Sequence, residues 1–348
     1  MKQKTVLQLI SGLGCGGAEK ILLDTSIQLK QNSVIASHLI SFSNELGLLN
    51  DYVDNNIEVN VLKKDKSLKS FFDICTFSNA YVRNQKIDIV HAHMFHAMII
   101  ATILKICNPK IKVVFTSHNV NLGNRWRELV TFLLSPLRTI DILFSEKMKQ
   151  YFHKSKTLII PNAINIQDYQ GETDKFKKFT FLAVGHLREA KNYPFLIQGV
   201  KKLKNLFDFQ LLIAGEGELK ETLQESIKKE KLEETIYLLG NIENIPKLLQ
   251  QSHCLVMPSI WEGMPLVILE AGACKLPIIS TLVGSIPSIL NDDNAYPSTL
   301  DDFTDKMVDV YQNYAIAEAK AVQFHAQVIK NHAIEKMTEE LEVLYLSL

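Results

Sequence analysis

The sequence predicts an α/β protein built as two tandem Rossmann-like domains. Short apolar runs typical of strands alternate with helical periodicity up to about residue 160, and the alternation resumes at about residue 179. Strands separated by helices form parallel sheets that helices cover on both faces. Between the two series, PNAINIQDYQGETDKFKK (161–178) is rich in turn formers and charge, as a linker is. Ligands are expected at the carboxyl ends of strands that face the cleft between the domains.

The first series predicts strands over residues 6–10, 37–41, 58–62, 88–91, 112–117, 140–144 and 158–160, with helices over 18–31, 68–83 and 95–107 among them. In the second series, the strand-like runs are FTFLAVG, FQLLIAG, IYLLG, CLVMPS and LPIIST, and a helical segment follows each one. The final stretch, AIEKMTEELEVLYLSL (333–348), has an apolar stripe at helical spacing and predicts one more helix.

Composition excludes several classes of protein. With 348 residues and 47% hydrophobic content, the chain can bury two cores, and extended disorder is not expected. Lys+Arg and Asp+Glu each number 38, so a net charge of zero argues against nucleic acid as a partner. The cysteines form no C-x-x-C pair, and no run approaches the ~20 apolar residues of a membrane span. We therefore expect a cytoplasmic protein with reduced thiols.

The turn after the first strand, in LQLISGLGCGGAEKILLDT, carries Gly12, Gly14 and Gly17 in the G-x-G-x-x-G spacing of dinucleotide-binding proteins. Such proteins need an acidic residue about 20 positions later, at the end of the second strand. ASHLISFSN lacks one there, and Glu45 comes too late. What remains is a glycine turn and a helix N-terminus that can approach a phosphate closely. A tight turn without a ligand is the alternative.

The most informative segment is MPSIWEGMPLVILEAGACKLPIIST in the second series. Its strand ends at Pro258, and Pro265 is expected as the first residue of a helix. Glu262 then lies just before the open helix N-terminus. Glu270 lies within the helix among apolar residues, where a carboxylate is costly to bury without hydrogen-bond donors. The hydroxyls of a sugar or a ribose would supply them, and a solvent-facing glutamate is the other interpretation.

The stretch E-G-M-P-L-V-I-L-E-A resembles the E-x7-E signature of the family-4 retaining glycosyltransferases of the GT-B fold. The resemblance extends over nearly the whole chain, through motifs in the family's order: GGAEK, DIVHAH, TSHN, IPNAIN, VGHLREAKN, LLIAGEGEL, LLGNIENI and LVGSIPSIL. It implies an acceptor-side domain over 1–165, onto which the last helix (333–348) packs back, and a nucleotide-sugar-binding domain over 166–332.

The resemblance also implies the residues of the site. The catalytic positions would be His118, which contacts the donor sugar beside the reacting carbon, Lys191, which neutralises the diphosphate, and Glu262, which contacts the transferred sugar. The other contacts to the nucleotide sugar would be Glu270 to the ribose, Gly16 and Gly17 to the diphosphate from the other domain, Gly240 and Asn241 to the base, and Gly263, Met264, Pro265 and Leu266 beside Glu262.

One position departs from the family's pattern. The family usually has G-R-L, whose arginine also grips the diphosphate, and this chain has His186 there. Histidine is only partly protonated near neutral pH. Arg188 lies two positions on, and alternate residues at a strand end share a face. Arg188 is therefore our candidate for the second cation, and His186 is the alternative.

The stretch HAHMFHA suggests a metal site at His91, His93 and His96, but no acidic or cysteine ligand accompanies them at useful spacing. The resemblance makes them cleft residues near the acceptor instead. No D-x-D pair stands at a strand end to hold a metal–diphosphate. We therefore expect no metal and no cofactor beyond the nucleotide sugar, with the leaving diphosphate stabilised by cations and helix N-termini.

The reaction implied by the resemblance is retaining, metal-independent transfer of a sugar from a UDP or GDP sugar to a glycan or lipid-linked acceptor, in surface polysaccharide or glycolipid synthesis. A sugar-nucleotide epimerase or a phosphorylase on the same plan would need ring acid/base residues or a lysine-held pyridoxal phosphate, and neither is legible in the sequence. A catalytically silent nucleotide-sugar-binding subunit is the alternative from another class, and the His186 departure favours it.

Two segments bear on where the acceptor is met. NRWRELVTFLLSPLR places an apolar stripe among arginines, as in helices at a membrane interface, although packing on the sheet explains the same pattern. The stripe is Trp126, Leu129, Val130, Leu133, Leu134 and Leu137, flanked by Arg125, Arg127 and Arg138. LKKDKSLKSFF (62–72) adds lysines beside two phenylalanines. Together they raise the hypothesis of a peripheral contact with anionic lipid on the inner face of the membrane, with a solvated lysine face as the alternative.

Overall fold

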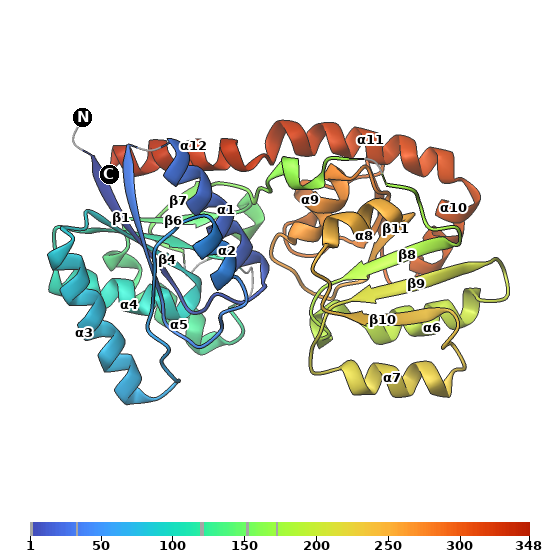
Figure 1. The fold of residues 1–348 in the computed structure, drawn as a ribbon, viewed down its shortest axis with the longest axis horizontal. Coiled ribbons are helices and arrows are strands. Elements are labelled where there is room, and N and C mark those ends of the chain that lie inside the picture. The colour runs from blue at the N-terminus through green and yellow to red at the C-terminus, as the bar shows by residue number, and fades with distance from the viewer. Residues whose placement is uncertain (1–2, 33, 119–121, 151–152, 172) are drawn as a thin grey trace. The chain divides into compact units, whose positions relative to one another are not determined.

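The computed structural model describes residues 3–32, 34–118, 122–150, 153–171 and 173–348. The chain divides into two compact units (Figure 1): an N-terminal unit of Met1–Ala163 with Ile334–Leu348, and a C-terminal unit of Ile164–Ala333. Each unit is a parallel sheet whose strands are joined by helices. The predicted α/β class with two Rossmann-like units is confirmed.

In the described part of the N-terminal unit, seven strands pair in the order β3-β2-β1-β4-β5-β6-β7. They are β1 (Lys4–Ile10), β2 (Ile35–Ser41), β3 (Val59–Val61), β4 (Ile89–His93), β5 (Lys112–Thr116), β6 (Ile140–Leu143) and β7 (Lys156–Ile159). The helices are α1 (Gly17–Asn32), α2 (Leu49–Asp54), α3 (Leu68–Asn84), α4 (Met94–Cys107) and α5 (Arg125–Leu133). The strands predicted for this series are all present, with ends shifted by one or two residues.

The described C-terminal unit has six strands in the order β10-β9-β8-β11-β12-β13. They are β8 (Phe179–Val184), β9 (Phe209–Ala214), β10 (Ile236–Gly240), β11 (Cys254–Met257), β12 (Ile278–Thr281) and β13 (Tyr296–Ser298). The helices are α6 (Tyr193–Leu203), α7 (Lys220–Lys229), α8 (Ile245–Gln251), α9 (Leu266–Ala273), α10 (Phe303–Gln312) and α11 (Tyr314–Asn331). Within the predicted linker, Ile166–Tyr169 form a short 3-10 helix.

The last helix, α12 (Ile334–Ser347), belongs to the N-terminal unit and packs on α1 and β1. Its buried stripe is Ile334, Met337, Thr338, Leu341, Leu344 and Tyr345. Through Tyr345, the end of the chain places a hydroxyl inside the N-terminal unit.

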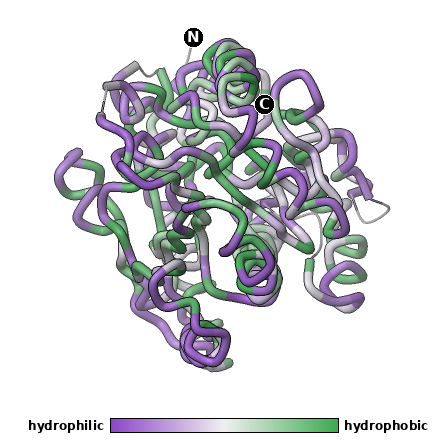
Figure 2. Tube along the Cα trace, turned by 90° about the vertical axis from the view of Figure 1, so that its right-hand side faces the viewer, coloured by the Kyte–Doolittle hydropathy of each residue, from purple (hydrophilic) through white to green (hydrophobic). Residues whose placement is uncertain are grey.

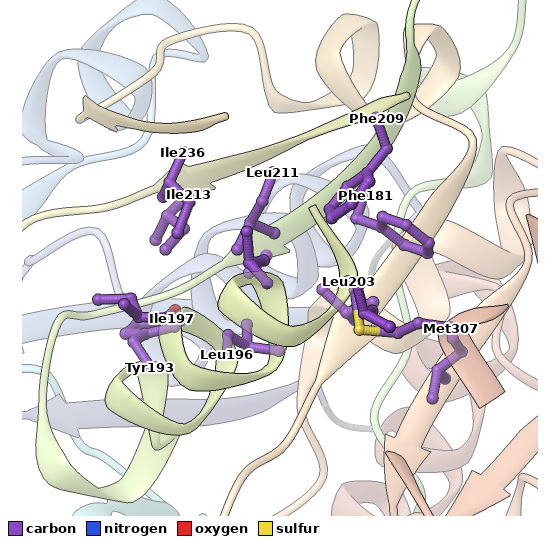
Figure 3. Close-up of a cluster of buried hydrophobic side chains, with 14 of the residues drawn as sticks. Phe181, Tyr193, Leu196, Ile197, Leu203, Phe209, Leu211, Ile213, Ile236 and Met307 are labelled. Carbon is purple, nitrogen blue, oxygen red and sulfur yellow. The ribbon is translucent and has the colours of Figure 1, made fainter. Parts of the chain in front are cut away.

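Each unit has its own apolar core. In the C-terminal unit, side chains of α6 pack against residues of β8, β9 and β10, including Tyr193, Leu196, Phe181 and Phe209 (Figure 3). In the N-terminal unit, a corresponding cluster lies between α3, α4 and the strands β1, β4 and β5. Figure 2 shows helices that carry both hydrophobic and hydrophilic residues, as expected of helices buried on one face only. In the described part of the chain, no helix combines the length and the apolar character needed to cross a membrane.

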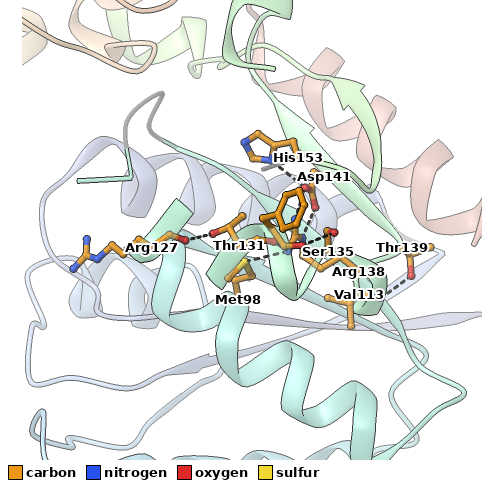
Figure 4. A network of polar contacts seen from close by, with 10 residues as sticks. Met98, Val113, Arg127, Thr131, Ser135, Arg138, Thr139, Asp141 and His153 are labelled. Atoms are coloured by element: carbon orange, nitrogen blue, oxygen red, sulfur yellow. Dashed lines mark hydrogen bonds and ion pairs between the residues drawn. The ribbon is translucent and has the colours of Figure 1, made fainter. Parts of the chain in front are cut away.

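A buried ion pair anchors the segment after α5 (Figure 4). Arg138 donates to Asp141 through Nε–Oδ1 at 2.7 Å and Nη2–Oδ2 at 2.8 Å, and His153 Nδ1 lies 3.0 Å from Asp141 Oδ2. Burial acts to raise the pKa of Asp141, but the hydrogen bonds from Arg138 and His153 hold it below its usual value. The expectation that Arg138 flanks an exposed apolar stripe is wrong, because its side chain is needed inside to balance Asp141.

Both sheets have the doubly wound order, in which the chain leaves the first strand in one direction and later crosses to the other side. The crossover point lies between β1 and β4 in the N-terminal unit and between β8 and β11 in the C-terminal unit. Ligands of such sheets bind beyond the carboxyl ends of the strands at this point. A ligand of either unit is therefore expected beside the residues that follow β8 and β11 or those that end β1 and β4.

Candidate functional site

In the C-terminal unit, two residues predicted for the site meet at the crossover point. Lys191 ends a 3-10 turn, Glu189–Lys191, that follows β8, and Glu262 follows β11. Lys191 Nζ lies 2.7 Å from Glu262 Oε1, and the same oxygen accepts a hydrogen bond of 2.7 Å from Ser259 Oγ. The side chains of Lys191 and Glu262 are only 10% and 7% exposed. An ammonium and a carboxylate this deeply buried need each other, because removing either leaves an uncompensated charge.

Gly185 makes room for this pair. Its φ is +144°, and a Cβ there would lie 2.8 Å from Lys191 Cε and 3.2 Å from Nζ. The carbonyl of Gly185 accepts a hydrogen bond of 3.0 Å from the hydroxyl of Tyr193. Burial raises the pKa of Tyr193, and the nearby Glu262 carboxylate raises it further, so Tyr193 keeps its proton and acts as a donor. Gly185 was not among the predicted site residues, although a glycine directly after a strand was the available signal.

The loops after β8 and β11 are joined by backbone contacts. Ile260 N–H donates to the carbonyl of Ala190 at 2.8 Å, and Asn192 Nδ2 donates to that of Pro258 at 3.3 Å. Asn192 adopts a left-handed conformation, with φ +55°, which asparagine tolerates better than most residues. The loop that carries Lys191 is thereby fixed to the loop that leads to Glu262.

Glycines also end the neighbouring strands. Gly215 N–H donates to Gly240 C=O at 2.8 Å, and Gly185 N–H donates to Ala214 C=O at 2.9 Å. A Cβ on Gly215 would lie 2.1 Å from the Gly185 carbonyl oxygen, so no other residue fits there. Gly240, predicted beside the base with Asn241, has φ +69° and ends β10. Backbone atoms of these glycines therefore lie close together at this edge, and a Cβ on Gly240 would lie 2.9 Å from Glu216 Oε1.

The loop before α9 differs in one detail from expectation. Pro265 is the N-cap residue of α9, with φ −71° and ψ 127°, and the helix begins at Leu266. The expectation that Pro265 is the first helical residue is wrong by one position, because its ψ remains extended. Gly284, with φ +59°, supports this loop: a Cβ there would lie 2.1 Å from the Glu262 carbonyl oxygen. Gly263 and Met264 are buried in the same loop.

Glu270 has an accessible side chain in α9. Every other residue of this helix, which is described in full, is buried. The pKa of the Cys274 thiol is raised to about 12, chiefly by burial and secondly by the negative charge of Glu270. The position agrees with a contact to a ligand at the carboxyl edge and also with a contact to solvent, so its assignment to the ribose stays a prediction.

Of the two candidates for the second cation, Arg188 is the one whose carbonyl oxygen accepts a hydrogen bond from Lys191 N–H, at 3.0 Å. His186 and Arg188 are both exposed, and the buried Leu187 separates them. The positive charge of Arg188 lowers the pKa of Tyr193, whereas the negative charge of Glu262 raises it. Arg188 therefore lies close to the cluster that contains Lys191.

In the N-terminal unit, the glycine turn is lined by carboxylates. A Cβ on Gly16 would lie 2.5 Å from Glu19 Oε2, and one on Gly12 would lie 2.8 Å from Glu45 Oε2. Leu13 N–H also donates to the Glu45 carbonyl at 2.8 Å. The small residues thus admit acidic side chains over the start of α1. The contact of Gly16 and Gly17 with a diphosphate stays a prediction.

The histidines separate into a buried group and a surface residue. His91 and His93 on β4 are buried, and His118, just after β5, is partly exposed. Burial lowers the pKa of His91 to about 3, that of His118 to about 4, and that of His93 well below its usual value. His96 lies on α4. Its pKa is lowered chiefly by burial and, to a lesser extent, by the positive charges of Arg127 and Lys66. The expectation that His91 and His93 line a cleft is wrong, because both rings face the interior.

A polar network that the sequence pattern did not predict surrounds these rings. Gln8 on β1, Thr116 on β5 and Tyr345 on α12 bond to His91 and His93. These side chains and His118 line a small cavity. The volume within it that the centre of a water molecule can occupy is about 10 Å³, which is near the lower limit for holding one water. A glutamine within the apolar strand KTVLQLI was the available signal. Within the described ranges, no cluster of three His, Cys, Asp or Glu side chains is arranged to hold a metal.

Comparisons with known proteins show which protein families the two units resemble. Residues 15–168 match the family model described as Glycosyltransferase Family 4, and residues 166–326 match the one described as Glycosyl transferases group 1. An uncharacterized glycosyltransferase of Methanocaldococcus jannaschii is 40% identical over 139 residues, which are 37% of this chain and 34% of that protein. The UDP-Gal:alpha-D-GlcNAc-diphosphoundecaprenol alpha-1,3-galactosyltransferase of Escherichia coli is 26% identical over 87% of each chain.

A solved structure shows the same fold. The crystal structure of Anabaena HepE in complex with UDP and glucose superposes with a TM-score of 0.86 at 15% identity, covering 99% of this chain and 100% of that one. The similarity extends over both units.

Proposed function

Because the chain is a glycosyltransferase with a family 4 domain and a group 1 domain, we propose that it transfers a sugar from a nucleotide-diphosphate sugar to a glycan or lipid-linked acceptor. The observation that carries the proposal is the Lys191–Glu262 pair at the crossover point of the C-terminal sheet. It places one fixed cation and one carboxylate where a ligand of such a sheet binds.

The donor is assigned to the C-terminal unit. Lys191, with Arg188 nearby, neutralises the diphosphate, and the start of α9 adds its dipole. Glu262 and the loop Gly263, Met264, Pro265 and Leu266 contact the transferred sugar. Glu270 holds the ribose, and Gly240 with Asn241 contacts the base.

The proposed chemistry uses these groups and no metal. The bond between the anomeric carbon and the diphosphate breaks, and a bond from the acceptor oxygen forms on the same face. The acceptor proton passes to the departing phosphate oxygen. Charge develops on that phosphate, so preorganised cations at Lys191 and Arg188 stabilise the transition state more than the ground state.

The relatives suggest which substrates to test first. The name of the Escherichia coli relative specifies a UDP sugar and a diphosphoundecaprenol-linked acceptor, and the HepE crystals hold UDP and glucose. We therefore propose a UDP sugar as donor, ahead of a GDP sugar, and a lipid-linked sugar as acceptor in surface polysaccharide or glycolipid synthesis.

A lipid-linked acceptor agrees with the surface of α5. On this helix Trp126, Leu129 and Leu133 are 62%, 52% and 61% exposed. Val130 and Leu134 pack against the core of the N-terminal unit instead. The predicted stripe is therefore divided, and its outer half is an apolar surface at helical spacing.

Basic residues accompany that surface. The charges of Lys66, two residues before α3, and of Arg127 on α5 both lower the pKa of His96. At the start of α3, Leu68 is 72% exposed and Phe72 is 61% exposed. Apolar side chains among cations match the chemistry of an anionic lipid surface. We propose that the N-terminal unit makes a peripheral contact with the inner face of a membrane through α5 and the start of α3.

The donor proposal is tested by thermal shift and turnover. The melting temperature is measured with UDP, GDP, ADP and CMP sugars, and the cognate nucleotide raises it, because binding to the native state stabilises by RT ln(1 + [L]/Kd). Release of the nucleoside diphosphate is then followed with and without acceptor lipid. Acceptor-dependent release supports a transferase. Binding without release would indicate a silent subunit, and acceptor-independent interconversion of two sugar nucleotides would indicate an epimerase.

The membrane contact is tested by flotation with vesicles of phosphatidylglycerol or of phosphatidylcholine. We expect wild type to float with the anionic vesicles only, less so at high salt. The variant Trp126→Ser/Leu129→Ser/Leu133→Ser should stay at the bottom, whereas Leu206→Ser, a change at an exposed leucine of the C-terminal unit, should float like wild type. Equal flotation of the triple variant would overturn the proposed contact.

A further inference from the structure

A continuous chain of hydrogen bonds connects α12 to His118 inside the N-terminal unit. Tyr345 Oη lies 3.2 Å from Gln8 Nε2, and Gln8 Oε1 lies 2.8 Å from His93 Nε2. His93 Nδ1 in turn lies 3.2 Å from His118 Nε2. A side branch runs from Tyr345 Oη to His91 Nδ1 at 2.6 Å and from His91 Nε2 to Thr116 Oγ1 at 2.6 Å.

The direction of this chain is set by the amide of Gln8. A buried, neutral imidazole has one donor nitrogen and one acceptor nitrogen. Since the Gln8 amide N–H donates to Tyr345, its oxygen accepts from His93 Nε2–H. His93 Nδ1 is then an acceptor, and it receives the proton of His118 Nε2–H.

The side branch follows from the same choice. Tyr345 accepts from Gln8, so its one hydroxyl proton goes to His91 Nδ1. His91 Nε2–H then donates to Thr116. All three histidines therefore carry their proton on Nε2, and turning over the Gln8 amide would move all three protons to Nδ1.

This coupling matters because His118 keeps Nδ1 as a hydrogen-bond acceptor. We propose that Tyr345, acting through Gln8 and His93, is a positioning residue for sugar transfer: it holds His118 in the Nε2–H tautomer, in which Nδ1 accepts a hydrogen bond from a donor-sugar hydroxyl. The inference rests on the proposed function for the role of His118, whereas the tautomer pattern does not depend on it. The small cavity beside these groups leaves little room for water to replace the Tyr345 hydroxyl.

The tautomers can be read by ¹⁵N NMR of histidine-labelled full-length protein at pH 7, with assignments from single histidine variants. We expect His91, His93 and His118 all as Nε2–H in wild type. In Tyr345→Phe, Gln8 loses its acceptor and His91 its donor, so His118 should shift to a mixture of tautomers. The matched control is Thr338→Val, which removes another buried hydroxyl of α12 that bonds only locally, to Ile334 C=O at 2.9 Å.

Turnover provides the second readout. Tyr345→Phe should lower kcat on the order of tenfold, as for one lost hydrogen bond, and leave the Kd for the nucleoside diphosphate unchanged. Thr338→Val should leave kcat and tautomers as in wild type. If Tyr345→Phe does not fold, Gln8→Met interrupts the same chain, and the wild-type spectrum remains a test by itself.

Three outcomes would overturn the inference: a proton on Nδ1 of any of the three wild-type histidines, unchanged His118 tautomers in Tyr345→Phe, or unchanged kcat in that variant. Coupled tautomers in a wild-type protein that transfers no sugar would instead count against the proposed function. The two failures are thereby distinguished.

Discussion

Lys191 and Glu262, which the resemblance assigns to the diphosphate and to the transferred sugar, bond to each other at 2.7 Å. The pair holds the ammonium in one place before any ligand arrives. It also means that a bound diphosphate must share Lys191 with a carboxylate. This competition changes what is expected when either residue is replaced.

Glu262→Gln removes the competing charge and keeps the shape of the side chain. We expect the affinity for the nucleoside diphosphate to be retained or to rise by up to about tenfold, because Lys191 is then free to face the phosphates. We expect kcat with the intact donor to fall, because the contact to the transferred sugar is lost. Calorimetry with the diphosphate and turnover of the donor measure the two effects. A loss of diphosphate affinity would contradict this assignment.

Glu270→Ala, unlike Glu262→Gln, should lower the affinity for the nucleoside diphosphate. If Glu270 holds the ribose, intact donor and free nucleotide lose the same contact, and both affinities should fall on the order of tenfold to a hundredfold. Glu221→Ala, at an exposed position of α7, is the control and should change neither. Equal affinities in Glu270→Ala and Glu221→Ala would contradict the assignment of Glu270 to the ribose.

Gly185→Ala should disturb Lys191 directly. The added Cβ meets Lys191 Cε at 2.8 Å, so the ammonium must move and nucleotide affinity should fall. The control is Gly171→Ala, where φ is also positive, at +119°, but the nearest atom is 4.0 Å away. Both variants carry the backbone strain of a left-handed alanine. If both reduce nucleotide affinity equally, strain is the cause and the contact with Lys191 is not.

Turnover should persist after treatment with EDTA. The proposed mechanism stabilises the leaving diphosphate with Lys191, Arg188 and the N-terminus of α9. The measurement is release of the nucleoside diphosphate before and after chelation, with Mg²⁺ and Mn²⁺ added back. Loss of activity that either ion restores would show that a metal takes part.

Acid should destabilise the N-terminal unit through His91. Its pKa is about 3 in the folded protein, chiefly because of burial, against 6.5 for an unperturbed histidine. Between these values the unfolded chain binds a proton that the folded chain does not. The contribution of His91 to the free energy of unfolding is therefore fully present above pH 6.5. It is lost as the pH falls towards 3, at up to about 1.4 kcal/mol per pH unit.

Urea unfolding at pH 6.5 and pH 5 measures this dependence. His91→Phe should be less stable at both values, because Tyr345 and Thr116 lose their partner, but its loss between them should be smaller than that of wild type. An unchanged difference between the two pH values would mean that His91 is already protonated in the fold.

Residue patterns were enough to predict the elements and the fold class. Apolar runs of strand length and helical periodicity depend on neighbouring residues, so β1, α3 and α9 could be placed within a few positions. The end of a helix was less certain: Pro265 precedes α9 because its ψ stays extended, and that angle is not visible in the pattern. The residues Lys191, Glu262 and His118 could be named, but only through a resemblance.

The tertiary structure alone decided which of these side chains meet. Lys191 and Glu262 are 71 positions apart, and Gln8 and Tyr345 are 337 apart. They come together because the order of strands in each sheet puts β8 beside β11 and β1 beside β4, and because α12 packs on α1 and β1. Strand order is settled by the packing of whole helices and sheets, which no local pattern records. For the same reason His91 and His93, expected in a cleft near the acceptor, lie inside, where His91 bonds to Tyr345 from the other end of the sequence and His93 bonds to Gln8.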